Sequence, residues 1–329
     1  MDTPETRPPA DGTWSGRTDG AGVAYARWHQ TVRLATGSDT ATGTASGVES
    51  GTDTDVALVG FASDEGVRRN QGRTGAAEGP TALRRALAPL ALHRELSIRD
   101  AGDVVVDGQA LEAGQEALGR AVAHLLDHSG LVVVLGGGHE TAYGSYLGRT
   151  GSRRTSGQRV GVLNLDAHFD LRVHSEATSG TPFAQMAHDD RAHGRDFVYA
   201  VLGVCRDANT PALFQAADEL GTRYLLDVEC VTTRTSEVIE FVDALLSDVD
   251  TLHLSIDLDV LPAAVAPGVS APAGFGVPME VLVTVVERAA ASGKLALVDV
   301  VELSPPHDQD GRTARSAARL ISSIVHAHR

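Results

Sequence analysis

Six side chains of the types that bind metal ions follow three short apolar runs in the sequence. The runs are rich in Val, Leu and Ile, and they are Leu131–Leu135, Val160–Leu165 and Thr251–Ile256. The six side chains that follow them are His139, Asp166, His168, Asp170, Asp257 and Asp259. In an extended chain alternate residues share a face, so the members of each set are expected to point the same way if strand geometry persists.

Carboxylates and imidazoles gathered in this way indicate bound cations. Like charges at close range are costly to bury unless something cationic lies between them. Six side chains are too many for one open site, and they suit two divalent ions about 3.5 Å apart. Mostly carboxylate with some imidazole, and no thiolate, favours Mn²⁺. A water held between two such ions loses a proton near neutral pH and can attack an electrophilic carbon. The pattern therefore predicts a two-metal hydrolase.

Each motif also has a structural explanation when it is taken alone. Three glycines before His139 could form a simple turn that leaves the histidine at the surface. The Asp166–Asp170 segment could be a hydrogen-bonded cluster at a strand end, and an Asp-x-Asp pair is often a helix cap or a solvated turn. Because the carboxyl ends of parallel strands meet at one edge of a sheet, the three motifs together favour the metal site.

Apolar runs alternate with amphipathic segments from residue 56 onward, which predicts a parallel sheet covered on both faces. The expected strands are Val56–Phe61, Leu131–Leu135, Val160–Leu165, Phe197–Val204, Tyr224–Val228, Thr251–Ile256 and Leu295–Val301. The expected helices are Leu111–His128, Ala212–Leu220, Ser236–Leu246, Met279–Ser292 and Thr313–His326. We therefore expect a single three-layer α/β domain with a mostly parallel, doubly wound sheet.

The N-terminal segment differs from the rest of the chain. Residues 1–54 are rich in Thr, Gly, Ser and Asp, above all from Ala35 to Asp55, and we expect them to be polar, partly disordered and mobile. The part from Trp14 to Val32 carries apolar aromatic residues that could dock on the body. Residues 55–329 are expected to form the catalytic domain.

Bulk properties narrow the partners and the compartment. The formal net charge of −15 argues against binding to nucleic acid or to an anionic membrane. Two cysteines outside any Cys-x-x-Cys motif fit a reducing compartment, and the N-terminus has no apolar core of a secretion signal. We expect a cytoplasmic protein.

The motifs Gly137-Gly138-His139, Asp166-Ala167-His168-Phe169-Asp170 and Ser255–Asp259 resemble, in this order and spacing, those of the ureohydrolase (arginase/agmatinase) superfamily. The resemblance runs from about Val56 to the C-terminus. It implies an arginase-like fold and a homo-oligomer. It also divides the ligands between two manganese ions: one would be held by His139, Asp166, Asp170 and Asp257, and the other by Asp166, His168, Asp257 and Asp259.

Within the superfamily the chain is most similar to the formimidoylglutamase branch. The likeness lies in Gly136–Glu140, Ser179–Phe183, Ser255–Pro262, Ala266–Pro272 and Asp310–Arg315, and in Arg69–Arg73. It implies hydrolysis of the amidine C–N bond of N-formimidoyl-L-glutamate to L-glutamate and formamide, a step of histidine degradation, with two Mn²⁺ per subunit.

The resemblance also suggests roles for residues outside the metal set. Asp170 would orient the attacking water and protonate the leaving amine, and Glu302 would accept two hydrogen bonds from the planar amidine, as carboxylates do. The substrate's amino-acid end would be bound by Arg172, Ser179, Thr181 and Asn209. Arginases carry a proton-transferring His where this chain has Phe183, which argues against arginine as substrate; His174, in the same loop, could take that role.

Two other functions share much of this evidence. A different guanidine or amidine hydrolase, such as an agmatinase or a guanidino-acid hydrolase, would need the same six ligands. A non-catalytic protein stabilised by metal is the alternative from another class, although a structural site needs no open coordination position.

Overall fold

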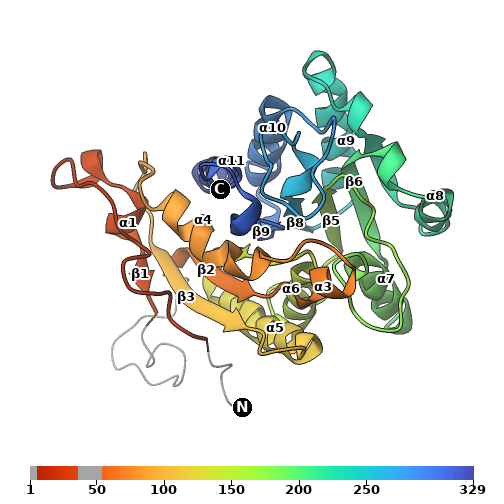
Figure 1. Cartoon of the computed structure of the whole chain (residues 1–329), viewed down its shortest axis with the longest axis horizontal. Helices are drawn as coiled ribbons and strands as arrows, with labels where there is room; N and C mark the ends of the chain where they lie inside the picture. Colours follow the sequence, from red (N-terminus) through yellow and green to blue (C-terminus); the bar gives the residue numbers. More distant parts are fainter. Residues whose placement is uncertain (1–5, 36–53) are drawn as a thin grey trace.

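The computed structural model describes residues 6–35 and 54–329, and its centre is one nine-stranded parallel sheet (Figure 1). The strand order is β1-β3-β2-β4-β9-β8-β5-β6-β7. The strands are β1 Arg33–Leu34, β2 Thr54–Ala62, β3 Ile98–Val105, β4 Ser129–Leu135, β5 Val160–Leu165, β6 Val198–Val204, β7 Arg223–Leu226, β8 Thr251–Asp257 and β9 Leu295–Val301. Every pairing between them is parallel.

Helices cover both faces of the sheet (Figure 1). One layer contains α5 Leu111–His128, α6 Thr141–Gly151 and α7 Pro182–Ala192. The other contains α4 Gly79–Leu87, α9 Thr235–Ser247, α10 Met279–Ala290 and α11 Arg312–Ala327. The other described α-helices are α1 Trp28–Thr31, α3 Glu65–Arg69 and α8 Pro211–Glu219. The expected three-layer α/β fold with a doubly wound parallel sheet is confirmed.

The elements with continuous apolar patterns were predicted within a few residues of their observed ends. The central strands β8 and β9 are buried along their whole length and β4 at every residue but Gly130, because both faces of the sheet are covered. Five described helices, α1, α3, α4, α6 and α7, and the edge-side strands β1 and β3 were not predicted. The apolar pattern of β3 is broken by Arg99, Asp100, Gly102 and Asp103, so it does not look like a buried strand.

A buried ion cluster explains the charged residues of β3. The guanidinium of Arg84, on α4, donates to both oxygens of Asp100 at 2.7 and 2.8 Å and also to Asp103. Arg84 and Asp100 are fully enclosed. A buried charge persists only when it is paired in this way, so the cluster ties α4 to β3.

The described N-terminal residues pack on this part of the sheet. Trp28 is fully buried, and the indole of Trp14 donates to Asp100 over 2.7 Å. These contacts are the docking expected for Trp14–Val32, and the next two residues form β1, which pairs with β3. The expectation of mobility concerns residues 1–54, of which 1–5 and 36–53 lie outside the described residues.

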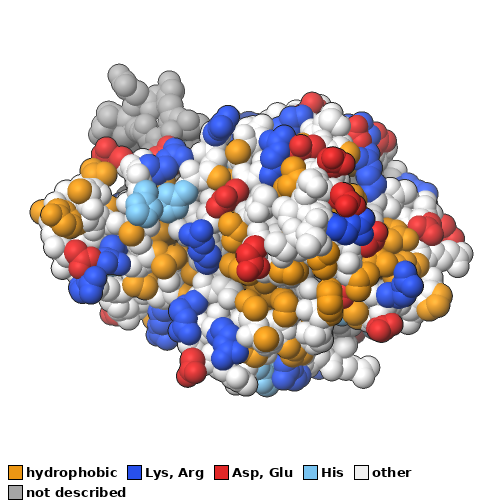
Figure 2. Space-filling view, turned by 90° about the horizontal axis from the view of Figure 1, so that it is seen from above, with side chains coloured by type: hydrophobic (Ala, Val, Ile, Leu, Met, Phe, Trp, Pro, Cys, Tyr) orange, Lys and Arg blue, Asp and Glu red, His pale blue; other side chains and the backbone are white. Residues whose placement is uncertain are grey.

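The helical face above the sheet carries both kinds of charge. Figure 2 shows Lys and Arg side chains interspersed with Asp and Glu, with hydrophobic side chains gathered in the middle of the face. Among the described residues, no helix combines the length and the apolar character needed to cross a bilayer.

Removing the cation of the buried cluster should destabilise the fold strongly. We expect Arg84→Met to lower the free energy of unfolding by about 3–5 kcal/mol, because two enclosed carboxylates would lose their partner. Urea unfolding followed by circular dichroism measures this. Arg85→Met is the matched control, since Arg85 lies on the same helix but is exposed; we expect a change within about 0.5 kcal/mol. Equal losses in the two variants would contradict the role of the cluster.

Candidate dinuclear metal centre

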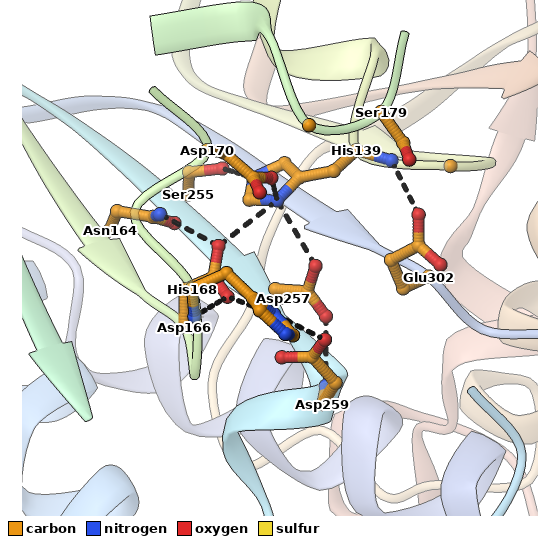
Figure 3. Close-up of polar contacts among 12 residues, drawn as sticks. His139, Asn164, Asp166, His168, Asp170, Ser179, Ser255, Asp257, Asp259 and Glu302 are labelled. Atoms are coloured by element: carbon orange, nitrogen blue, oxygen red, sulfur yellow. Dashed lines mark hydrogen bonds and ion pairs between the residues drawn. The ribbon is translucent and has the colours of Figure 1, made fainter. Parts of the chain in front are cut away.

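Four adjacent strands in the middle of the sheet deliver the candidate site. The strands β4, β9, β8 and β5 are consecutive neighbours in the sheet, although they are far apart in sequence. Their carboxyl ends lead to His139, Glu302, the Asp257/Asp259 pair and the Asp166–Asp170 segment respectively. Ligands of open α/β sheets bind at this edge, and here all six expected metal ligands meet (Figure 3).

The first ligand group surrounds one ring nitrogen. Nδ1 of His139 lies 3.2 Å from Asp166 Oδ2, 2.9 Å from Asp170 Oδ2 and 3.0 Å from Asp257 Oδ2. Figure 3 shows these three carboxylates converging on the imidazole. One atom each from these four residues could bind a single ion.

The second group is formed by Asp166, His168 and Asp259. Nδ1 of His168 lies 3.4 Å from Asp166 Oδ1 and 3.1 Å from Asp259 Oδ2. Asp166 belongs to both groups and uses one oxygen in each, so its carboxylate can bridge two ions. The family resemblance suggests a second bridge at Asp257; in the structure its Oδ2 faces His139, and its Oδ1 accepts from the backbone N–H of Asp259 at 2.8 Å.

The residues present fit metal ions better than they fit one another. His139 Nδ1 is buried among three carboxylates, yet it makes no hydrogen bond of proper geometry. Burial raises the pKa of Asp257 well above its usual range, and the nearby charges of Asp259 and Asp166 raise it further. Divalent cations in this space would remove that repulsion and favour the ionised carboxylates.

Polar side chains behind the ligands hold them in place. Nε2 of His139 is hydrogen-bonded to Ser255 Oγ at 3.0 Å, which leaves Nδ1 as the ligand atom. Asn164 donates to Asp166 Oδ2 at 2.9 Å. The ring of Phe183 is fully buried and meets the His139 ring edge-on at 5.3 Å. Asn164 and Ser255 were not predicted, although a polar residue inside an apolar strand is a signal that could have found them.

The ligands converge through turns rather than through continued strand geometry. β5 ends at Leu165, and Asp259 lies in a 3₁₀ turn, so the argument from alternating faces does not describe the site. Asp170 and Glu302 have positive φ values of 48° and 67°. A carboxylate residue adopts this left-handed conformation at an energetic cost, and such strain is concentrated at functional sites.

Glu302 presents an unpartnered oxygen beside the metal ligands. Its Oε1 accepts from the backbone N–H of His139 at 2.8 Å, whereas the buried Oε2 has no partner among the described residues. Burial and then the charge of Glu140 raise the pKa of Glu302 to about 8. Glu140, also fully buried, accepts from Ser63 Oγ at 2.8 Å and was not predicted. A cationic group next to Oε2 would satisfy it.

The expected substrate-binding residues divide into two pairs. Arg172 and Ser179 line the cavity of about 340 Å³ that contains the metal ligands and Glu302. Thr181 and Asn209 do not line it. Thr181 directly precedes α7. Its hydrogen bonds go to Thr178 and to Gln185.

Asn209 has a structural role in this site. Its amide donates to the carbonyls of Ala167 and Cys205 at 2.9 and 2.8 Å, and its oxygen accepts from Phe169 N–H. Both amide hydrogens are used by backbone carbonyls, so Asn209 holds the ligand loop in shape. His174, proposed as a substitute proton carrier, lines neighbouring hollows rather than the metal cavity.

Two overlapping ligand groups at the carboxyl edge of a parallel sheet define an α/β protein with a dinuclear metal site. Comparisons with known proteins agree: residues 54–327 match the model of the arginase family. The chain belongs to the arginase family.

The chain is also similar to individual proteins of known name. It is 55% identical to a formimidoylglutamase of Nocardia farcinica over 316 residues, 96% of each chain, and 53% identical to one of Rhodococcus opacus over 313 residues, 95% of this chain and 94% of that one. The crystal structure of Trypanosoma cruzi formiminoglutamase with Mn²⁺ matches with a TM-score of 0.75 at 26% identity, covering 84% of this chain and 93% of that one. Bacillus subtilis arginase, 24% identical with a TM-score of 0.70, covers 82% of this chain and 98% of that one and shares the fold.

Substitutions at shared and unshared ligands should differ in metal content. We expect Asp166→Ala to lose both ions, because its carboxylate belongs to both groups, and His168→Ala to lose only one. Inductively coupled plasma mass spectrometry of the purified proteins measures the stoichiometry. Asp207→Ala, at an exposed carboxylate on the same side of the sheet, should retain both ions. Loss of a single ion from Asp166→Ala would contradict the bridging geometry.

Proposed function

We propose that the protein is a manganese-dependent hydrolase that cleaves the amidine C–N bond of N-formimidoyl-L-glutamate, with L-glutamate and formamide as products. Relatives with this activity in their names are about half identical to the chain and match nearly its full length. The observation in the structure that carries the proposal is the unpartnered, buried Oε2 of Glu302 beside the metal ligands.

Glu302 suits an amidine because of its geometry and its surroundings. An amidinium is planar and donates two parallel hydrogen bonds, which a carboxylate accepts with both oxygens. The bond from His139 N–H fixes the orientation of the Glu302 carboxylate. Burial makes its charge costly while it is alone, and an incoming cation removes that cost. The site therefore selects a cationic, planar group.

The ligand groups would hold the two cations next to this carboxylate: His139, Asp166, Asp170 and Asp257 around one, and Asp166, His168 and Asp259 around the other, with Asp257 proposed as a further ligand of the second. When bound, the ions would lower the pKa of a bound water and so supply a nucleophile near neutral pH.

Asp170 is placed to move the proton. Its side chain is the most exposed carboxylate of the first ligand group, with 11% of its surface accessible, so it borders the cavity. It would accept a hydrogen bond from the attacking water, take up the proton that this water loses, and pass it to the amine nitrogen as the C–N bond breaks and glutamate leaves. Phe183 cannot carry a proton and instead packs against the ring of His139.

The substrate's amino-acid end meets Arg172 and Ser179. Both line the cavity on the side that carries Asp170, and the planar fork of Arg172 matches a carboxylate. Manganese is the proposed metal because the ligands are mainly carboxylates with imidazole. The solved T. cruzi relative, which contains Mn²⁺, supports this choice.

The proposal also covers the partners, the compartment and the assembly of the protein. The acidic net charge supports a protein that acts on a small molecule and not on nucleic acid. Two free cysteines support a reducing, cytoplasmic setting. We also propose a homo-oligomer, and a catalytic domain over residues 55–329 preceded by the polar segment 1–54.

A substrate panel tests the reaction directly. Manganese-loaded protein should release formamide and glutamate from N-formimidoyl-L-glutamate, and it should release no urea from agmatine, arginine or guanidinobutyrate. Chromatographic detection of formamide, ammonia and urea distinguishes the outcomes. Urea release from a guanidine substrate, with no formamide from the amidine, would show that the protein is another hydrolase of the family.

Changing Glu302 to its amide should weaken catalysis without loss of metal. Glu302→Gln keeps an acceptor for His139 N–H but removes the charge, so we expect kcat/KM to fall about 100-fold, the loss of a charge-assisted interaction of about 3 kcal/mol. Steady-state kinetics and metal analysis of the same preparation measure both effects. A variant with unchanged kcat/KM would exclude the amidine-binding role of Glu302.

A further inference from the structure

Two arginines line the metal cavity and a third, Arg69, lines a neighbouring hollow; the three differ in their partners. Arg69 is neutralised, since it forms ion pairs with Glu65 at 2.9 Å and Glu112 at 2.6 Å. Arg73 and Arg172 both line the cavity itself, and neither forms an ion pair with any carboxylate of the described chain. Two positive charges therefore face the cavity without a protein anion.

The guanidinium of Arg73 is held in a fixed position by backbone carbonyls. Its Nε donates to the carbonyl of Ser270 at 3.0 Å, and its Nη2 donates to the carbonyl of Val269. Its backbone N–H also donates to Ser270 Oγ at 2.9 Å. Nη1 has no partner among the described residues. Carbonyls orient the group but leave its charge intact, so Arg73 is ready to receive an anion.

Arg172 is oriented from the other wall of the cavity. Its Nη1 donates to Asn70 Oδ1 at 3.1 Å, and Asn70 Nδ2 donates to Ser179 Oγ at 3.1 Å. The segment Arg69–Arg73 thus touches both walls. It reaches the Arg172 loop through Asn70 and the Val269–Ser270 loop through Arg73.

The two walls fit a substrate with two carboxylates. In N-formimidoyl-L-glutamate the α-carboxylate is one carbon from the amidine nitrogen, so it must lie near the reacting centre, where Arg172 follows Asp170 by two residues. The side-chain carboxylate lies three carbons from that nitrogen and must be bound elsewhere. A cavity of about 340 Å³ accommodates both ends.

We propose that Arg73 binds the side-chain carboxylate of the substrate and so determines the preference for a dicarboxylate over a monocarboxylate. The inference rests on the proposed function, because it presumes an amidine at Glu302. The local charge balance supports it: the metal end of the cavity is rich in carboxylates, and an uncompensated second carboxylate on the substrate would be repelled from it. A fixed guanidinium supplies both the charge and the fork geometry for that group.

The test combines one substitution with two substrates. Arg73→Met keeps the length of the side chain but removes its charge. N-formimidoyl-L-glutamate carries both carboxylates, and N-formimidoyl-L-2-aminobutyrate lacks only the distal one. With Arg73→Met we expect kcat/KM to fall about 100-fold for the dicarboxylate, mainly through KM, and to change less than about threefold for the monocarboxylate.

Arg288→Met is the matched control. Arg288 lies on α10, remote from the cavity, and pairs with Asp243 at the surface. It should leave both substrates unaffected, and all three proteins should retain the same metal content. Equal losses of Arg73→Met on both substrates would overturn the proposal, because they would indicate a structural effect on the segment.

Binding measurements separate this inference from the proposed function. Calorimetry of the manganese-loaded protein with L-glutamate and with L-2-aminobutyrate does not depend on turnover. The wild type should prefer L-glutamate, and Arg73→Met should lose that preference. If the wild type binds L-glutamate through Arg73 but releases no formamide, the proposed reaction fails and the dicarboxylate site stands. If formamide is released but Arg73→Met keeps its preference, the dicarboxylate site fails alone.

Discussion

The structure depends on placing four carboxylates and two imidazoles in one buried space. Asp166, Asp257 and Asp259 are almost wholly enclosed, and burial together with the neighbouring carboxylates raises the pKa of Asp257 and Asp259 above the usual range. Cations are the natural counter-charge, and the surrounding fold is arranged so that no protein group fills that role completely. The repulsion between these carboxylates therefore both lowers the stability of the site and favours the binding of metal ions.

The order of the strands in the sheet, rather than proximity in the sequence, brings these side chains together. Chain segments that contain His139, Asp166, Asp257 and Glu302 become neighbours because β8 and β9, the last strands of the chain, lie between β4 and β5. The site cannot assemble until the C-terminal strands are in place. Positive φ values at Asp170 and Glu302 further show that packing holds their backbone away from its preferred conformation.

Part of this could be predicted from the sequence. The sequence predicted six candidate metal ligands because three groups of metal-binding residue types directly follow apolar strands, and the structure brings all six together. Long apolar patterns also predicted α5, β5 and β9 at their observed bounds. Strand β3 was missed because its charges are paired with Arg84, which is distant in sequence. The uses of Asn209 and Thr181 were also not predictable, since they depend on which backbone groups the folded loops leave unpaired. A local sequence pattern indicates which chemistry a residue can perform, but it does not indicate which residues contact it in the folded chain.

The division between the metal ligands and the segment Arg69–Arg73 has a consequence for how such proteins diversify. The ligands stand on turns fixed by the central strands, whereas Asn70 and Arg73 belong to a connection between α3 and α4 that contributes no ligand. Exchange of a few residues in this connection can alter which molecules enter without disturbing the ions. The metal-binding core of such a protein can therefore stay unchanged while the range of molecules that it accepts changes.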